Sequence, residues 1–341
     1  MNYNRLWFAA NGQFCRIQFH IFKFEDKGVI NMSYQVLTDS EVLKFTHMNY
    51  IINVIEQVFY EKENGCLISP PRFRLETENG DLVFTAGAAT GISKVTGFRV
   101  YDNYSNDEPG HEQLVAVFDS ETGVFKGIII GNSLGAIRTG AIGGVAINVM
   151  SRPDATRLAI IGTGAQARTQ LQAAVAIRDI KQIRVYSRND QNRMKFAKEM
   201  SEKLSMNVIP VDCPKKCVEN ADIVICATNS LSPVLEADWL NQGVHINTIG
   251  PKSINGSEIP IELASRSAVI TTDSLEQLNA YSTPHFLVGT PYEDNIVQLS
   301  DVMTGTKSGR TLNNQMTLFC SVGLSGTEVV VANEIMKLAK K

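Results

Sequence analysis

A glycine-rich turn is the strongest chemical signal in the sequence. Gly162, Gly164 and Ala167 have the G-x-G-x-x-A spacing, between an apolar stretch at 157–161 and an expected helix at 165–177. The first glycine permits a tight turn, the second lets the backbone approach a pyrophosphate, and the alanine lets the helix pack closely on the sheet. The helix N-terminus offers free N–H groups to phosphate. This context predicts a Rossmann site whose NAD(H) or NADP(H) contacts Gly162, Gly164, Ala165, Gln166 and Ala167.

The residues that distinguish NAD from NADP are expected about 20 positions further on, at the end of the next strand. Ser187 and Arg188 occupy that place, after an expected strand at 182–186. An acid there would bond the 2′-hydroxyl of NAD, whereas Ser187 cannot repel a 2′-phosphate and Arg188 could pair with one. The sequence therefore favours NADP(H) and leaves NAD(H) possible.

The elements around this turn predict an α/β fold with two domains. Residues 138–310 alternate short apolar strands with helices, which indicates a Rossmann doubly wound sheet. Residues 32–137 hold two helices and then short strands with turn signals, which predict an α+β domain with a largely antiparallel sheet. We expect residues 311–341 to complete that domain. Residues 1–31 are interpreted as an N-terminal extension, either disordered or the product of an over-called start.

Composition excludes several classes of function. The chain has 341 residues, a net charge of −3 and six cysteines. Nothing in this charge favours nucleic acid or an anionic membrane as a partner. No apolar run approaches the roughly 18 residues that span a bilayer. Cys213 and Cys217 have no second Cys or His pair to complete a zinc site, so we expect no metal, reduced thiols and a cytoplasmic location.

Several ordered motifs are similar to those of one protein family. They are Ser69 to Arg72, Gly110 to Gln113, Ala136 to Ala141, Ile161 to Arg168, Ala221 to Val224, His245 to Gly250, and Ser321 to Leu324. From Met32 to its C-terminus the chain resembles the ornithine cyclodeaminase/mu-crystallin family. The resemblance implies a nicotinamide-dependent protein for small amino or imino acids. It also implies a homodimer, in which the first domain, completed by the C-terminal helix, forms the dimer surface and the substrate pocket.

The resemblance assigns candidate roles to particular residues. Arg72 matches the family's carboxylate clamp, a task that suits the bidentate guanidinium, and Arg74 on the same strand face is its backup. Arg138 matches an arginine at the domain seam that contacts substrate and cofactor. His111 matches a histidine that either touches substrate or is structural. The further cofactor contacts expected are Arg138, Thr139, Thr228, Asn229, Ile249, Gly250, Ser321 and Gly323.

Two departures from the family pattern bear on mechanism. Where the family has a catalytic lysine in a Gly-x-Lys setting, this chain has Arg99, and Lys94 is the only nearby lysine. Arginine stays protonated, so Arg99 could hold a carboxylate but could not act as an acid or base, whereas a buried lysine could. Where cyclodeaminases have an aspartate for the side-chain amine, this chain has Lys252.

These departures favour net hydride transfer over cyclodeamination. A protonated imine is already electrophilic, so positioning supplies much of the catalysis. We therefore expect an NAD(P)H-dependent reductase or dehydrogenase of small 2-imino acids, such as a ketimine reductase for pyrroline-2-carboxylate or piperideine-2-carboxylate, or an amino-acid dehydrogenase. The alternatives are an ornithine cyclodeaminase, a non-catalytic mu-crystallin-like NADPH-binding protein, and an elimination on a cyclic hydroxy-amino acid.

Overall fold

The computed structural model describes residues 8–10, 13–15, 34–104 and 110–340. An antiparallel pair, β1 (Phe8–Ala10) and β2 (Gln13–Cys15), belongs to a unit of its own. The rest of the predicted N-terminal extension, 1–31, lies outside the described residues. The remaining described residues fall within the unit that runs from Tyr34 to the C-terminus.

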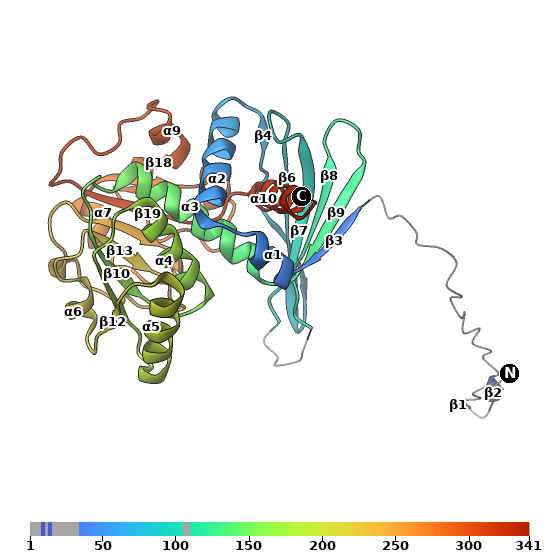
Figure 1. Cartoon of the computed structure of the whole chain (residues 1–341), viewed down its shortest axis with the longest axis horizontal. Helices are drawn as coiled ribbons and strands as arrows, with labels where there is room; N and C mark the ends of the chain where they lie inside the picture. The colour runs from blue at the N-terminus through green and yellow to red at the C-terminus, as the bar shows by residue number, and fades with distance from the viewer. Residues whose placement is uncertain (1–7, 11–12, 16–33, 105–109, 341) are drawn as a thin grey trace. The chain divides into compact units, whose positions relative to one another are not determined.

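An eight-stranded parallel sheet forms the Rossmann part, in the order β12-β11-β10-β13-β14-β19-β17-β18 (Figure 1). Its strands are β10 (Arg157–Ile161), β11 (Gln182–Tyr186), β12 (Val208–Pro210), β13 (Ile223–Cys226), β14 (His245–Thr248), β17 (Ser267–Thr272), β18 (Ile296–Gln298) and β19 (Met316–Cys320). Alternate residues along β10 belong to two separate apolar clusters. One cluster includes α4 (Ala165–Ile177) and α5 (Asp190–Leu204), and the other α6 (Pro214–Val218), α7 (Glu262–Arg266) and α8 (Leu275–Asn279). Since side chains alternate across a strand, helices cover both faces, and the doubly wound α/β prediction is confirmed.

A second, seven-stranded sheet forms the first domain and is mostly antiparallel. Its strands are β3 (Gln35–Thr38), β4 (Leu67–Ile68), β5 (Phe73–Thr77), β6 (Gly80–Ala89), β7 (Val95–Asp102), β8 (Leu114–Asp119) and β9 (Phe125–Ile130). Only β3 runs parallel to its neighbour, β9. The last helix, α10 (Thr327–Ala339), packs along β6, β7 and β8. One face of this sheet is therefore covered from within the chain.

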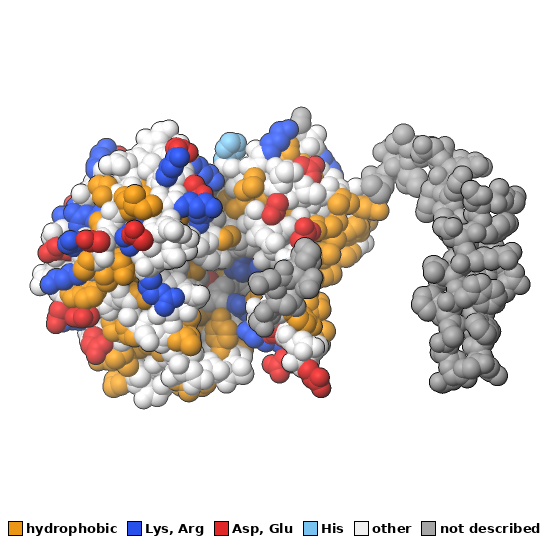
Figure 2. Space-filling view, turned by 90° about the horizontal axis from the view of Figure 1, so that it is seen from below, with side chains coloured by type: hydrophobic (Ala, Val, Ile, Leu, Met, Phe, Trp, Pro, Cys, Tyr) orange, Lys and Arg blue, Asp and Glu red, His pale blue; other side chains and the backbone are white. Residues whose placement is uncertain are grey.

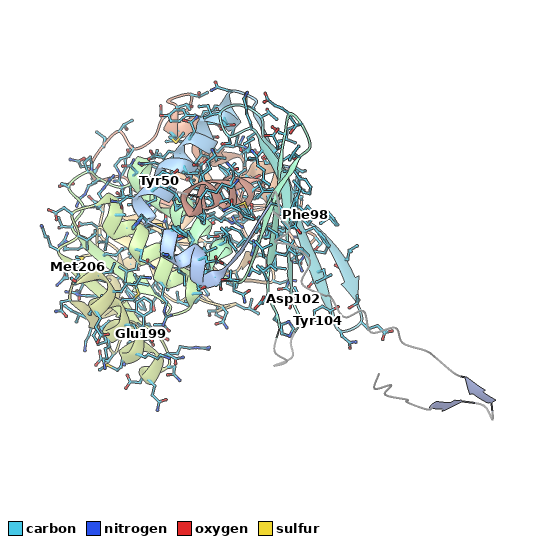
Figure 3. All side chains as sticks on the ribbon, turned by 45° about the vertical axis from the view of Figure 1, so that its right-hand side comes forward. Tyr50, Phe98, Asp102, Tyr104, Glu199 and Met206 are labelled. Carbon is cyan, nitrogen blue, oxygen red and sulfur yellow. The ribbon has the colours of Figure 1, made fainter. Side chains whose placement is uncertain are left out.

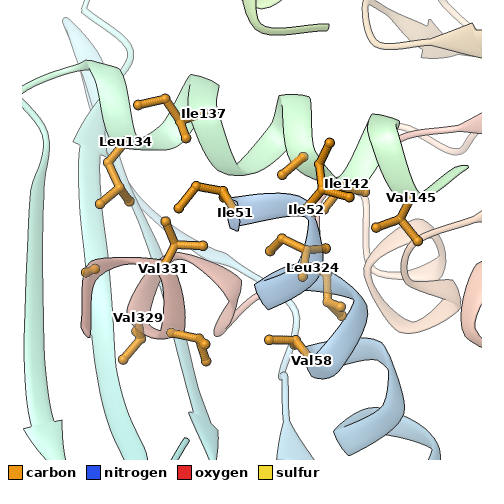
Figure 4. Close-up of a cluster of buried hydrophobic side chains, with 14 of the residues drawn as sticks. Ile51, Ile52, Val58, Leu134, Ile137, Ile142, Val145, Leu324, Val329 and Val331 are labelled. Atoms are coloured by element: carbon orange, nitrogen blue, oxygen red, sulfur yellow. The ribbon is translucent and has the colours of Figure 1, made fainter. Parts of the chain in front are cut away.

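Three helices make the core between the two sheets. They are α2 (Met48–Glu63), α3 (Ser133–Met150) and α10, whose aliphatic side chains interlock, as Figure 4 shows. The helix α3 has the length and the mean hydropathy, 1.2, of a membrane span, but 78% of it is buried inside the protein. It is thus the core helix of a globular protein. Its small residues allow the close approach to α4, because a Cβ at Gly140 would lie 2.7 Å from the Thr169 side chain.

Local sequence signals set most element boundaries. A capping box precedes α1 (Asp39–Phe45), with the Thr38 N–H donating to Glu41 Oε2 at 2.9 Å. The prediction that residues 311–341 complete the first domain is wrong in part. The strand β19 lies in the Rossmann sheet between β14 and β17, and only α10 returns to the first sheet. The run Met316–Cys320 is buried on both faces, so it lacks the alternation by which half-buried strands are recognised.

Candidate functional site

The glycine turn lies at one end of a cavity of about 590 Å³ over the carboxyl ends of β10, β11 and β13. A cavity in this place is where doubly wound folds bind dinucleotides. Most of the predicted cofactor residues line it, namely Gly162, Gly164, Ala165, Gln166, Ser187, Arg188, Thr228, Asn229, Ile249 and Gly250.

The glycines of the turn have the geometry that the pyrophosphate requires. Gly162 has φ +115°, and a Cβ there would lie 2.2 Å from the Ala227 carbonyl oxygen. Gly164 is the N-cap of α4 and has nothing within 4 Å of its would-be Cβ, so the phosphates can approach the helix N-terminus. Ala167 is fully buried and is not among the described residues that line the cavity, so the geometry supports its packing role and gives no support to its predicted cofactor contact.

The ribose end of this cavity holds a cation and no acid. Ser187 and Arg188 follow β11 and line the cavity, and no Asp or Glu is among the described lining residues. Arg188 is exposed. Asn189 accepts the Asn192 N–H at 2.8 Å and thereby fixes the start of α5 just beyond. The carboxylate typical of an NAD-specific site is therefore absent from the described residues of this lining.

A second cavity of about 530 Å³ adjoins the first, since Gln166, Ile249 and Gly250 line both. Its walls come from the first sheet, from α3, from the segment after β14 and from the loop after β19. The basic side chains that line it are Arg72, Arg74, Arg99, Arg138 and Lys252. No acidic side chain is among the described residues of its wall. The second cavity therefore has a wall rich in cationic side chains and adjoins the predicted dinucleotide site.

Arg72 is held rigidly at the edge of this second cavity. Its backbone N–H and its Nε both donate to Gln277 Oε1, at 2.9 and 3.0 Å, and its Nη1 donates to Tyr101 at 3.3 Å. Its Nη2 donates to the Val322 carbonyl. No carboxylate of the described chain pairs with Arg72. A fixed guanidinium without an acid partner is able to receive a carboxylate, and the role of Arg72 as the substrate clamp stays a prediction.

Arg99 and Arg138 share one buried carboxylate. Glu328 Oε1 lies 3.6 Å from Arg99 Nη1 and 3.2 Å from Arg138 Nη2. Burial alone would raise the pKa of Glu328, but Arg138 and Arg99 hold it below its usual value. Gln113 Oε1 accepts two further bonds from Arg99, whose pKa burial and Arg138 lower to about 10. Arg99 is therefore a fixed cation, and it does not replace the family lysine as an acid.

Arg138 keeps donors for a ligand. Its Nε and Nη1 are buried and have no partner among the described residues. Gly323, with φ +92°, lies so close that its would-be Cβ would be 3.3 Å from Arg138 Nη1. Ser321, Gly323 and Thr139 line the same cavity. Arg138 therefore lines the cavity with two unused donors, and its contact with substrate and cofactor stays a prediction.

Two predicted residues do not reach the cavity, and the prediction is corrected for both. Lys94 lies in the turn before β7 with φ +49°, and its exposed Nζ pairs with Glu121 at 2.8 Å. His111 Nδ1 pairs with Asp102 Oδ1 at 2.7 Å beyond the end of β7. A positive-φ turn directs Lys94 away from the inward face on which Arg99 lies. Arg74 lines the cavity, but it pairs with Asp81 at 2.9 Å.

Other residues of the site carried no recognisable sequence signal. Asp273 accepts the N–H groups of Val322 and Gly323, at 2.7 and 2.9 Å, and thereby shapes the loop over the cavity. Glu258 accepts N–H groups of Ile249 and Gly250. Gln277 holds Arg72, and Glu328 holds Arg99 and Arg138. Each of these residues is distant in sequence from the group that it contacts. In the sequence, only a polar side chain within an apolar segment could have indicated its role.

Comparisons with known proteins agree with this geometry. Residues 32–341 match the model of the ornithine cyclodeaminase/mu-crystallin family. The chain is 29% identical to a Delta(1)-pyrroline-2-carboxylate reductase of Bacillus cereus, over 89% of this chain and 96% of that one. The Thermococcus litoralis reductase of the same name, solved with NADH and L-proline, is 31% identical, covering 89% and 97%, with a TM-score of 0.83. An archaeal alanine dehydrogenase dimer with bound NAD is 25% identical, covering 90% and 96%, with a TM-score of 0.81.

Proposed function

Because the chain belongs to the ornithine cyclodeaminase/mu-crystallin family, we propose that it is an NAD(P)H-dependent reductase of small 2-imino acids. The observation that carries the proposal is the junction of two cavities. A glycine-turn site that fits a dinucleotide opens onto a wall of arginines that fits a carboxylate. The relatives named for imine reduction and for amino-acid oxidation support the same class of chemistry.

The reaction follows from where the charges lie. When bound, the cofactor supplies the hydride, and adding it to a protonated imine gives the amine without a further proton. Arg72 and the free donors of Arg138 hold the substrate carboxylate, so the adjacent C=N carbon is fixed at the seam of the two cavities. Arg99 contributes to the positive electrostatic potential of the second cavity. No general acid is required in the hydride step, which explains how arginine can stand at the position of Arg99.

Cyclodeamination of ornithine fits this cavity less well. That reaction must bind a side-chain ammonium, yet the described wall presents cations and no acid. Lys252 would repel the ammonium directly.

Two finer properties belong to the proposal. NADP(H) is the preferred cofactor, because Arg188 and Ser187 stand at the ribose position without an acid. NAD(H) binding stays compatible with the glycine turn, and relatives were solved with NADH and NAD. The free thiols of Cys66, Cys213 and Cys226 suit a reducing, cytoplasmic compartment.

We further propose a homodimer formed through the uncovered face of the first sheet. The outer face presents Val36, Phe73, Leu75, Leu82, Phe84, Phe98, Val100 and Leu114. Phe73 and Leu75 are 54% and 53% exposed. Figure 2 shows hydrophobic side chains gathered where this sheet lies, and in Figure 3 Phe98 stands on the side away from the helices. Apolar faces of this kind mark protein interfaces.

The test is turnover with purified protein. NADPH or NADH should be oxidised on addition of pyrroline-2-carboxylate, piperideine-2-carboxylate, or a 2-oxo acid with ammonium, each followed by absorbance of the reduced cofactor. Ornithine with a trace of NAD⁺ is the control. Release of proline and ammonia from ornithine, with no imino acid reduced, would show a cyclodeaminase. Tight cofactor binding with no turnover of any substrate would show a binding protein.

A further inference from the structure

The basic residues of the second cavity differ in how their charges are balanced. Arg74 pairs with Asp81, and Arg99 and Arg138 share Glu328. Neither Arg72 nor Lys252 has a carboxylate within ion-pair distance in the part of the chain that the structure describes. One substrate carboxylate accounts for Arg72. The charge of Lys252 is then left without a counter-ion.

The acids closest to Lys252 are already engaged. Glu258 accepts N–H groups from Thr228, Ile249 and Gly250 with its two oxygens. Asp273 accepts the N–H groups of the loop after β19. Among the described residues, Lys252 Nζ donates only to the Gly250 carbonyl, and an ammonium carries three donors. The remaining donors of Lys252 are available to a ligand in the cavity that it lines.

A buried histidine lies beside this lysine. Lys252 begins the short strand β15 (Lys252–Ser253), and Ser253 forms an antiparallel bridge with His285. The Phe286 N–H donates to the Lys252 carbonyl at 3.1 Å, which extends the same pairing. Both side chains line the second cavity. The backbone pairing therefore fixes them next to each other.

His285 offers a donor that nothing in the described chain uses. It is 2% exposed, and its Nδ1 accepts the Leu287 N–H at 3.5 Å. Burial and Lys252 lower its pKa to about 3, so the ring is neutral and its proton is on Nε2. Nε2 is buried with no partner. An unpaired buried donor is costly, and an anionic oxygen bound beside Lys252 would satisfy it.

We propose that Lys252 and His285 form a subsite for a second carboxylate, so that the substrate is a 2-imino dicarboxylic acid. Resting on the proposed function, this inference narrows the substrate class of the same site. Arg72 binds the carboxylate next to the imine carbon. Lys252 and His285 bind the carboxylate of the side chain.

Pairs of substrates with the same number of carbon atoms test the effect of the side-chain carboxylate. Oxaloacetate is compared with 2-oxobutyrate, and 2-oxoglutarate with 2-oxopentanoate, each with ammonium and reduced cofactor. The dicarboxylic member of each pair should have a kcat/KM at least about tenfold higher. K252Q should remove this preference by raising the dicarboxylic KM on the order of 30-fold, and H285L should reduce it. K215Q, at an exposed lysine on α6, is the matched control and should leave the ratio unchanged.

Other outcomes would overturn the inference. The inference fails if the parent protein prefers the monocarboxylic substrates. It also fails if K252Q lowers kcat equally for dicarboxylic and monocarboxylic substrates, because Lys252 would then act in the chemical step. If no imino acid of either class is reduced, the proposed function fails. Calorimetry on the cofactor-loaded protein still decides the subsite, since succinate should bind more tightly than butyrate and K252Q should abolish the difference. Equal affinities would rule the subsite out.

Discussion

Arg138 and Glu328 form a buried ion pair, with Arg138 Nη2 3.2 Å from Glu328 Oε1 and side chains 7% and 1% exposed. The pair joins α3, at the domain seam, to the first residues of α10. It explains why the last helix must return to the first domain. Without its carboxylate, the arginines of the substrate wall would repel each other in a region of low dielectric.

Removing that carboxylate should destabilise the protein strongly. In E328Q, Arg99 and Arg138 lose their shared counter-ion, and the expected cost is on the order of 3–5 kcal/mol, measured by urea unfolding at pH 7. E121Q is the control, because Glu121 is 60% exposed and pairs only with the surface residue Lys94. Its cost should stay within about 1 kcal/mol. Equal effects in the two variants would contradict a special role for Glu328.

The carboxylate clamp should depend on guanidinium geometry at Arg72. R72K keeps the charge but loses the bidentate contact and the bonds to Gln277, so KM for the imino acid should rise at least about tenfold. Steady-state kinetics on the best substrate provides the measurement. R74K is the comparison, since Arg74 is paired with Asp81, and its KM should change by less than about threefold. If KM rises more in R74K than in R72K, the substrate carboxylate binds to Arg74 instead of Arg72.

Cofactor choice should respond to the charge at the end of β11. S187D places a carboxylate where the 2′-phosphate of NADPH would lie, and like charges at this distance cost several kcal/mol, on the order of a 100-fold loss in kcat/KM for NADPH. NADH should lose much less. A protein that already prefers NADH, with no change of preference in S187D, would contradict the NADP(H) assignment.

Stability should fall in acid through the buried histidine of β14. His245 is fully buried between Thr317 and Asn247, and burial lowers its pKa to about 3 from 6.5. Above pH 6.5 both the folded and the unfolded state are neutral at this ring. As the pH falls below 6.5, only the unfolded state takes up the proton, so stability is lost until about pH 3.

The size of that loss can be measured as a difference between two pH values. From these pKa values His245 alone should cost on the order of 2 kcal/mol on going from pH 7 to pH 5. In H245Q the difference in unfolding free energy between the two pH values should shrink by about that amount. H47Q, at an exposed histidine before α2, should leave it unchanged. An unaltered difference in H245Q would show that His245 is protonated when folded.

The uncovered sheet face should control assembly. L82E introduces a charge on the apolar face, where Leu82 lies between Leu75 of β5 and Asp102 of β7, and it should convert a dimer into a monomer in light scattering. I92E is the control, because Ile92 is 72% exposed in the loop between β6 and β7, off the face. A monomeric parent protein, or an L82E variant that remains dimeric, would contradict this interface.

The sequence by itself determined the parts that depend on neighbours along the chain. Gly162, Gly164 and Ala167 announce the dinucleotide turn because the backbone there admits few other residues. The expected helix at 165–177 is confirmed, since it begins directly after the glycine turn. The arginines that line the second cavity were predicted from motifs that are similar to those of a known family.

Only the tertiary structure decided which of these side chains work together. Lys94 and Arg99 are five positions apart, and whether each faces the cavity depends on a positive-φ turn and on strand pairing with β8. Glu328 looks like an ordinary acid at a helix start until α10 packs beside α3. His285 lies in a loop with no pattern, and its bridge to Ser253 brings it to Lys252. The interior has a low dielectric constant, so the stability of each buried charge depends on the groups that lie next to it in the fold. These groups can come from any part of the sequence.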